Sequence, residues 1–258
     1  MIEAPVENLF RGLHSPPDLT RADDTTDAAP VMHGHFSRFD TWYEIDSWYE
    51  GQFLERTVKG AFRKTIRENR DQVKVQFDHG YDMNIGDALL GPIDDLREDD
   101  EGPAFEVPLL DTDYNHDRIL PMLEGRLMGG EKRGSLLGVS FRFRVTRDEW
   151  VKEPKVSDHN PTGIPERTIK EVRLFEFGPV VWPANAEADI GVRSLSDHYF
   201  VKELARSGRA ERAARQFAHA LPDAALVAPP VPAAPPVEAP GTRGRLLAAA
   251  RHQILALQ

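Results

Sequence analysis

The chain of 258 residues contains no cysteine, which excludes disulfide bonds, zinc–thiolate sites and a cysteine nucleophile. It also lacks an excess of positive charge, since 42 acidic residues outnumber 32 lysines and arginines and give a formal net charge of -10. We therefore expect no general affinity for nucleic acid or for anionic membranes. No apolar run is long enough to span a bilayer and no signal-peptide hydrophobic region is found, so we expect a soluble, cytoplasmic protein.

Composition divides the chain into five segments. Residues 1–30 are rich in proline and acidic residues without sustained periodicity, which indicates a flexible arm, and residues 31–196 carry the strand and helix patterns of a folded domain. Residues 197–221 are rich in alanine, arginine and glutamate and are expected to form a helical extension. Residues 222–242 form a proline- and alanine-rich linker, and residues 243–258 form a short amphipathic helix.

Residues 138–145 alternate apolar and polar side chains with period two, which predicts a half-buried strand. One face of this strand carries the hydroxyl of Ser140 together with the guanidinium groups of Arg142 and Arg144. Such surroundings suit a nucleophile whose transition state develops negative charge. An ordinary serine on a solvated strand face is the alternative that this segment leaves open.

A second predicted strand, residues 73–79, ends in a histidine. Val73, Val75, Phe77 and His79 share its apolar face, and Gly80 ends it. An imidazole at the end of a buried strand suits a general base, since packing holds it while its tip is accessible. A structural, hydrogen-bonded histidine is the alternative.

The third segment, residues 171–185, places a carboxylate in apolar surroundings. Both faces of this segment look buried from Leu174 onward, and a carboxylate such as that of Glu176 is costly there without a partner. An imidazolium is one such partner, and the guanidinium of Arg142 or Arg144 is the other.

His33 and His35 raise the question of a metal site. Residues two apart point the same way along a strand, so these two with His79 define a rival hypothesis, a metal-dependent hydrolase. No third ligand lies near His33 and His35 in the sequence, and we expect neither a metal nor another cofactor.

Several pieces of the chain together resemble the caudovirus prohead serine proteases, the maturation proteases of tailed bacteriophages. The resemblance runs from about Gly34 to Val192, and the order and spacing of its pieces make it specific. These pieces are Gly51-Gln52-Phe53-Leu54-Glu55 with Lys59-Gly60-Ala61-Phe62, Phe77-Asp78-His79 with Ile85-Gly86, Leu110-Asp111-Thr112, Gly138-Val139-Ser140-Phe141-Arg142-Phe143, Leu174-Phe175-Glu176-Phe177-Gly178-Pro179-Val180, and Pro183-Ala184-Asn185-Ala186.

The resemblance implies a fold and a site. The fold is mainly β with flanking helices (α+β), a closed antiparallel β-barrel of the herpesvirus-assemblin type. The site is a serine endopeptidase triad of nucleophile Ser140, base His79 and third member Glu176. By the usual logic of acyl transfer we further expect main-chain N–H groups, with Arg142 or Arg144 in support, to form the oxyanion hole. His159 and Asp78 are lower-ranked candidates for the third member.

The resemblance also implies partners and a place of action. The expected substrates are the scaffold, the scaffolding arm of the major capsid protein, and the protease itself, cleaved in the host cytoplasm inside the assembling procapsid. The portal protein and a second copy of the chain are further candidate partners. The C-terminal helix, residues 243–258, is interpreted either as a docking tag that autocleavage in the linker releases or as a disordered tail.

Two departures from the family pattern concern the neighbours of the site residues. Family members often have glycine two residues after the serine, where this chain has Arg142, and many have a serine soon after the glutamate, where it has Gly178-Pro179. Neither departure removes a triad member. The remaining rival is a non-catalytic scaffold or assembly protein on a degenerate protease barrel, which predicts that Ser140 and His79 lie too far apart to meet.

Overall fold

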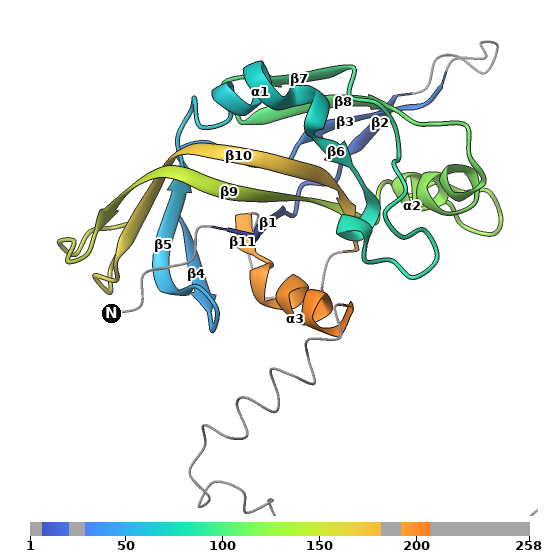
Figure 1. Ribbon diagram of the computed structural model, residues 1–258. Coiled ribbons are helices and arrows are strands. Elements are labelled where there is room, and N and C mark those ends of the chain that lie inside the picture. Colours follow the sequence, from blue (N-terminus) through green and yellow to red (C-terminus); the bar gives the residue numbers. More distant parts are fainter. Residues whose placement is uncertain (1–6, 21–28, 182–191, 207–258) are drawn as a thin grey trace, which may run out of the picture. The chain divides into compact units, whose positions relative to one another are not determined.

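Two β-sheets with short flanking helices make up the part of the chain that the computed structural model describes, residues 7–20, 29–181 and 192–206 (Figure 1). The seven-stranded sheet has the order β11 (Val192–Ser194), β1 (Leu9–Leu13), β9 (Gly138–Val151), β10 (Glu166–Val180), β5 (Gly51–Thr57) and β4 (Tyr43–Ser47), with β6 (Lys74–Val75) also pairing with β10. The four-stranded sheet has the order β2 (Asp18–Thr20), β3 (Val31–His35), β8 (Pro103–Pro108) and β7 (Asp95–Glu98).

Short helices connect and cover these strands. They are the α-helices α1 (Arg63–Asn69), α2 (Leu120–Glu124) and α3 (Ser196–Arg206), the 3₁₀ turns Arg70–Gln72 and Phe77–Gly80, and the π-helical turn Asn115–Ile119. Among the described residues, none of the helices combines the length and apolar character that crossing a membrane requires.

The antiparallel hairpin of β9 and β10 forms the centre of the larger sheet. Strand β9 follows the predicted alternation, with Val139, Phe141 and Phe143 buried. Figure 1 shows the four-stranded sheet on one side of this hairpin and α3 on the other. The main hydrophobic core lies between the hairpin and the four-stranded sheet, where the rings of Phe36 and Phe177 stack with centroids 5.0 Å apart.

The prediction of a closed barrel is wrong, although the mainly β, α+β class is correct. β10 pairs in parallel with β5 at its start and with β6 near its end, and α1 contacts its edge in between. There the Thr65 hydroxyl donates to the carbonyl of Val172 and accepts from the amide of Leu174. A helix thus takes the position that a continuous barrel strand would occupy.

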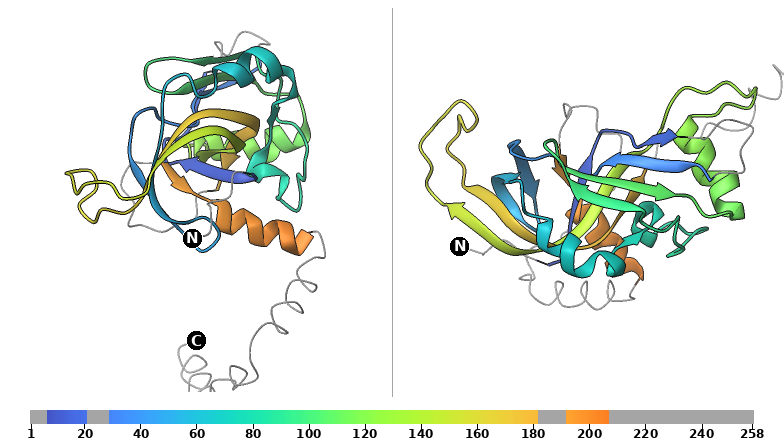
Figure 2. Two further views of the ribbon diagram at one scale, coloured as in Figure 1. Left: turned by 60° about the vertical axis from the view of Figure 1, so that its left-hand side comes forward. Right: turned by 90° about the horizontal axis from the view of Figure 1, so that it is seen from above.

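The ends of the larger sheet also remain unpaired with each other. β4 and β11 lie near each other (Figure 2), but in the described part of the chain they are not paired as neighbouring strands of the sheet. Side chains bridge this region instead, where the Ser47 hydroxyl donates to Asp197 at 2.7 Å and Ser194 donates to Glu50 at 2.6 Å. The sheet is therefore open.

The interpretation of residues 1–30 as a flexible arm is also wrong in part. Within that range, β1 (Leu9–Leu13) is fully buried between β9 and β11, and β2 (Asp18–Thr20) pairs with β3. Of the predicted helix of residues 197–221, the structure describes only the residues up to Arg206, and these belong to α3 (Ser196–Arg206). The linker of residues 222–242 and the helix of residues 243–258 lie outside the described residues, so those predictions stand untested.

Candidate active site

Ser140 lies in β9, opposite Gly12 of β1 and Gly178 of β10 in the two antiparallel pairings. Strands therefore flank the serine on both sides, and its exposed fraction is 0%. Its Oγ lies 2.7 Å from Nε2 of His79 and 2.9 Å from the main-chain oxygen of Arg11. Because a hydroxyl carries one proton, Ser140 can donate to only one of these acceptors at a time.

His79 lies in a turn, not at the end of a strand. The predicted strand of residues 73–79 is realised only at Lys74–Val75, and the chain then enters the 3₁₀ turn Phe77–Gly80. Within that turn Asp78 and His79 have φ values of 47° and 56°, in the left-handed region that residues other than glycine seldom adopt. This conformation directs the buried imidazole at Ser140.

Glu176 lies in β10 at a register shift that follows Leu174. Its side chain is buried, and Oε1 is hydrogen-bonded to Nδ1 of His79. Of the two partners expected for this carboxylate, an imidazole and an arginine, the structure supplies the imidazole. Oε2 has no hydrogen-bond partner among the described residues.

The structure thus brings Ser140, His79 and Glu176 together although they are far apart in the chain. The seryl oxygen is at Nε2 of the imidazole and the carboxylate is at Nδ1, so the three groups form one continuous hydrogen-bonded row. An arrangement of this kind can move a proton from a hydroxyl to an imidazole whose tautomer the carboxylate fixes.

Arg142 and Arg144, which we expected to support the oxyanion hole, contact residues other than Ser140 and His79. Arg144 forms an ion pair with Glu7, and the Arg142 guanidinium lies 5.7 Å from the ring centroid of Phe175. Among the described contacts, neither arginine forms a hydrogen bond with the serine–histidine pair, and the Nε atom of each has no partner there. Neither guanidinium is therefore in contact with the serine hydroxyl in this conformation.

The histidines of the metal hypothesis are not grouped. His33 is hydrogen-bonded to Thr20 and His35 to Asp99, each at 2.7 Å from Nε2. His79 is hydrogen-bonded instead to Ser140 and Glu176, so the three histidines have separate partners. In the part of the chain that the structure describes, no group of three or more potential ligand side chains could hold a metal ion.

The two lower-ranked candidates for the third triad member are not at the imidazole nitrogens. His159 is hydrogen-bonded to Glu166 at 3.1 Å and stacks on Trp42 with ring centroids 5.1 Å apart. Asp78 adjoins His79 in the chain, but its carboxylate accepts hydrogen bonds from Tyr199 and Lys202 of α3.

A buried ionic cluster, which the sequence did not reveal, ties β1 to β5 and to the β4–β5 connection. The Arg11 side chain is fully buried and donates to Glu50 and Glu55 at 2.7–3.1 Å. Burial disfavours its charge, but the two carboxylates outweigh burial and raise the pKa of Arg11 well above its ordinary value. Burial likewise opposes ionisation of Glu50, and Arg11 with two serine hydroxyls nevertheless lowers the pKa of that carboxyl. The cluster fixes the Arg11 carbonyl beside Ser140.

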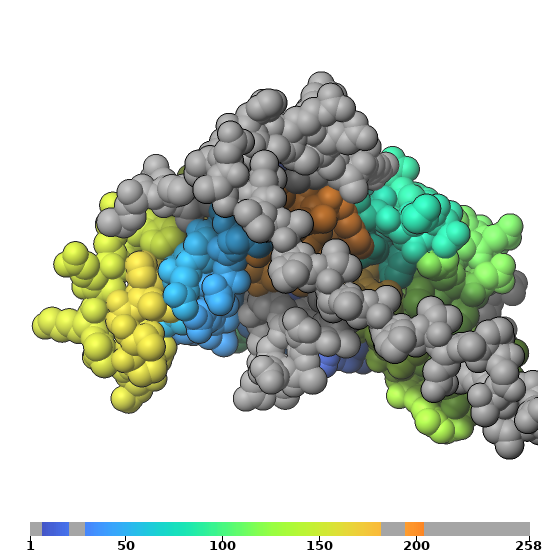
Figure 3. All heavy atoms as spheres, turned by 90° about the horizontal axis from the view of Figure 1, so that it is seen from below, coloured from blue at the N-terminus to red at the C-terminus, as the bar shows by residue number. Residues whose placement is uncertain are grey.

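Two aromatic rings cover the imidazole of His79. The ring centroids of Phe10 and Tyr199 lie 4.9 and 4.3 Å from that of the imidazole, each in an edge-to-face arrangement. Figure 3 shows α3 (orange), which carries Tyr199, between the β4–β5 region (blue) and the segment that follows β6 (teal). A cavity of about 130 Å³ adjoins these rings, lined by Asn8, Phe10, Tyr49, Tyr81, Arg142, Tyr199, Phe200 and Glu203.

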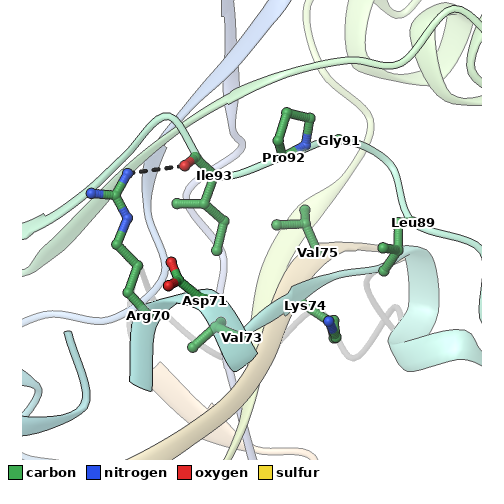
Figure 4. A pocket seen from close by; sticks show the side chains of 9 residues that line it. All are labelled: Arg70, Asp71, Val73, Lys74, Val75, Leu89, Gly91, Pro92 and Ile93. Atoms are coloured by element: carbon green, nitrogen blue, oxygen red, sulfur yellow. Dashed lines mark hydrogen bonds between the residues drawn. The ribbon is translucent and has the colours of Figure 1, made fainter. Parts of the chain in front are cut away.

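A larger cavity of about 280 Å³ lies beside β6 and contains none of the three site residues (Figure 4). Its lining residues are Arg70, Asp71, Val73, Lys74, Val75, Leu89, Gly91, Pro92 and Ile93. Arg70 donates to the carbonyl of Ile93 at 2.9 Å, as the dashed line in Figure 4 marks, so its guanidinium is already engaged. We assign no chemistry to this cavity.

Comparison with known proteins identifies the family. The family model described as caudovirus prohead serine protease matches residues 18–200, which is more than half of the chain. The protein therefore belongs to this family, as its sequence motifs predicted. No curated protein matches the chain. Among solved structures it is similar to the capsid assembly protease gp21 of bacteriophage T4, with 12% identity, a TM-score of 0.41, and coverage of 69% of this chain and 98% of that chain.

Family membership defines the chain as a protease of the phage prohead, the assembling capsid within the host. The matched range contains His79, Ser140 and Glu176. It does not contain β1, which lies before residue 18 and supplies the Arg11 carbonyl at the serine.

Proposed function

We propose that the chain is a serine endopeptidase in which Ser140 is the nucleophile, His79 the general base and Glu176 the group that orients the base. The observation that carries this proposal is the 2.7 Å separation of Ser140 Oγ from His79 Nε2, with Glu176 at the opposite ring nitrogen. When Nδ1 donates its proton to Glu176, Nε2 is left without a proton and can accept one from the serine.

Cleavage then proceeds by acyl transfer. As the Ser140 oxygen attacks the peptide carbonyl carbon, its proton passes to Nε2 of His79, and the imidazolium is stabilised by the carboxylate of Glu176. The same proton passes to the leaving amine as the peptide C–N bond breaks, and water hydrolyses the resulting ester. Main-chain N–H groups, with Arg142 or Arg144 in support, stabilise the oxyanion, a contribution of about 10²–10³ in rate for one donor.

The described conformation is closed to a protein substrate. Ser140 has no exposed surface and His79 is 5% exposed, beneath β1 and the rings of Phe10 and Tyr199. A peptide carbonyl must come within about 3–3.5 Å of the nucleophile to react. Cleavage therefore requires that the groups above the serine move aside when substrate binds.

The substrates that we propose are the scaffold or the scaffolding arm of the major capsid protein, and the protease chain itself. This specific choice follows the family resemblance, because the described residues do not identify a recognition sequence. Binding to the portal protein and formation of a dimer stay predictions on the same ground.

The non-catalytic alternative, an assembly protein on a degenerate protease fold, predicts that Ser140 and His79 do not meet. Their 2.7 Å contact, and the burial of a carboxylate on the same imidazole, favour an enzyme. A purely structural role does not require a hydroxyl, an imidazole and a carboxylate to be hydrogen-bonded in this order, whereas proton transfer from a serine nucleophile does.

Co-expression with the capsid subunit tests the proposal. Wild-type protein is expected to yield capsid-subunit and protease fragments in intact-mass spectra, whereas Ser140→Ala is expected to yield only uncut chains. Ser135→Ala, in the loop before β9, is the matched control and should cleave normally. Continued cleavage by Ser140→Ala would exclude Ser140 as the nucleophile.

A further inference from the structure

The turn that carries His79 is held in a conformation that its sequence does not favour by itself. Asp78, His79 and Gly80 are consecutive left-handed residues, with φ values of 47°, 56° and 75°. Side chains with a Cβ atom are disfavoured in this region, and such residues persist where the surrounding structure fixes them. Some contact outside the turn must therefore maintain it.

That contact comes from α3. The Tyr199 hydroxyl donates to Oδ1 of Asp78 and the Lys202 ammonium to Oδ2, each at 2.7 Å. The Asp78 side chain is 15% exposed, so these bonds are largely shielded from water. The ring of Tyr199 also lies edge-to-face against His79, so one residue contacts both members of the strained pair.

α3 is itself anchored at a second place. At its first turn, Asp197 accepts hydrogen bonds from the hydroxyl of Ser47 and from the main-chain amides of Trp48 and Tyr49. The helix is thus fixed to the β4–β5 connection at one end and holds the His79 turn from its middle.

We propose that Asp78 and Tyr199 are positioning residues of the protease site, which hold the left-handed turn so that Nε2 of His79 faces Ser140. This inference rests on the proposed function and adds to it, because neither residue touches the reacting atoms. Asp78 acts through the backbone of the turn and Tyr199 through Asp78 and the face of the imidazole. Lys202 contributes by neutralising the carboxylate.

The experiment compares Asp78→Ala, Asp78→Asn and Tyr199→Phe in cleavage of a capsid-derived peptide. Asp78→Ala is expected to lower kcat by about 10²-fold with KM little changed, since a displacement of about 1 Å at a reacting group has that effect. Tyr199→Phe loses one hydrogen bond to a charged group and should lower kcat by about 10-fold. Asp78→Asn should retain most of the wild-type activity, because asparagine tolerates the left-handed region and its side-chain oxygen can still accept the hydrogen bond from Tyr199.

A spectroscopic measurement separates positioning from general stability. The proton between His79 Nδ1 and Glu176 gives a downfield imidazole resonance in ¹H NMR, which can be recorded in the Ser140→Ala background, where no cleavage occurs. We expect Asp78→Ala to weaken or remove it and Asp78→Asn to retain it. The matched control is Tyr114→Phe, which deletes a tyrosine hydroxyl bonded to the main-chain carbonyl of Leu89 at 2.5 Å, outside the three-residue site and the Arg11 cluster, and should leave kcat within about twofold.

Wild-type kcat and an unchanged resonance in folded Asp78→Ala would overturn the inference. If that variant does not fold, Tyr199→Phe decides, since it removes a single oxygen atom, and unchanged kcat in this variant would equally overturn it. A failure of the proposed function has a different signature, because Ser140→Ala would then still cleave while the resonance continued to respond to Asp78.

Discussion

Replacement of Glu176 by glutamine removes the charge behind the imidazole while keeping the shape of the side chain. Glu176 is 2% exposed and its Oε1 is bonded to Nδ1 of His79, so water cannot readily replace the lost charge. An ion pair about 4 Å apart is worth about 4 kcal/mol at an effective dielectric constant of about 20. This corresponds to about 10³ in the rate of forming the imidazolium, because about 1.4 kcal/mol changes a rate tenfold.

The amide has a second effect on the tautomer of the imidazole. If the NH₂ group of the glutamine faces Nδ1, His79 must carry its proton on Nε2 and cannot accept from Ser140. The second oxygen of Glu176 has no hydrogen-bond partner in the described part of the chain that would hold the amide in the other orientation. We therefore expect kcat of Glu176→Gln to fall by about 10³–10⁴, in line with the corresponding change in other serine protease triads.

The assay measures kcat and KM for a capsid-derived peptide with wild type, Glu176→Gln and the control Glu171→Gln. Glu171 is also in β10, but its side chain is bonded to Lys64 and Thr146 away from the site, and its replacement should change kcat less than twofold. KM of Glu176→Gln should stay close to the wild-type value, since Glu176 acts on the transition state. A variant that kept more than a tenth of the wild-type kcat would refute the assigned role.

Two further predictions concern the support of the site. Gly178→Ala would place a Cβ 1.9 Å from the carbonyl oxygen of Gln76, so the chain leading to the His79 turn must shift. We expect the free energy of unfolding in urea to fall by about 1–3 kcal/mol and kcat to fall as well. The control Gly129→Ala has open space around its Cβ and should change neither quantity. The folded state lowers the pKa of Glu50, so its stabilising contribution is complete above the unfolded value of about 4.3 and is lost as the pH falls through the lower folded value. Urea unfolding should show a loss of stability below about pH 4.3 that Glu50→Gln reduces, and an identical pH dependence in both proteins would contradict this account.

The parts of the fold that sequence could predict are those in which burial alternates along one strand. The period-two pattern of residues 138–145 predicted β9 because Val139, Phe141 and Phe143 face the core while Arg142 and Arg144 are partly exposed. The family resemblance implied a hydroxyl, an imidazole and a carboxylate as one site, and the structure brings these groups together.

The parts that could not be predicted depend on contacts distant in sequence. β1 is buried on both faces and so has no alternation, and the carboxylates that stabilise its Arg11 lie 39 and 44 residues further along the chain. The prediction of a closed barrel was wrong because no local sequence pattern indicates that α1 contacts the edge of β10 at Val172. The alternating apolar residues before His79 favoured a strand, while the contacts of Asp78 with α3 hold a left-handed turn.

Labelling with a fluorophosphonate tests the central claim most directly, because it reports which side chain is the activated nucleophile. Peptide mass spectrometry of the full-length wild-type protein, treated in the presence and absence of the capsid subunit, should locate the added phosphonate on Ser140. The label should be lost in His79→Ala and strongly reduced in Glu176→Gln. Labelling of another residue, or cleavage of the capsid subunit that persists in Ser140→Ala, would contradict the account.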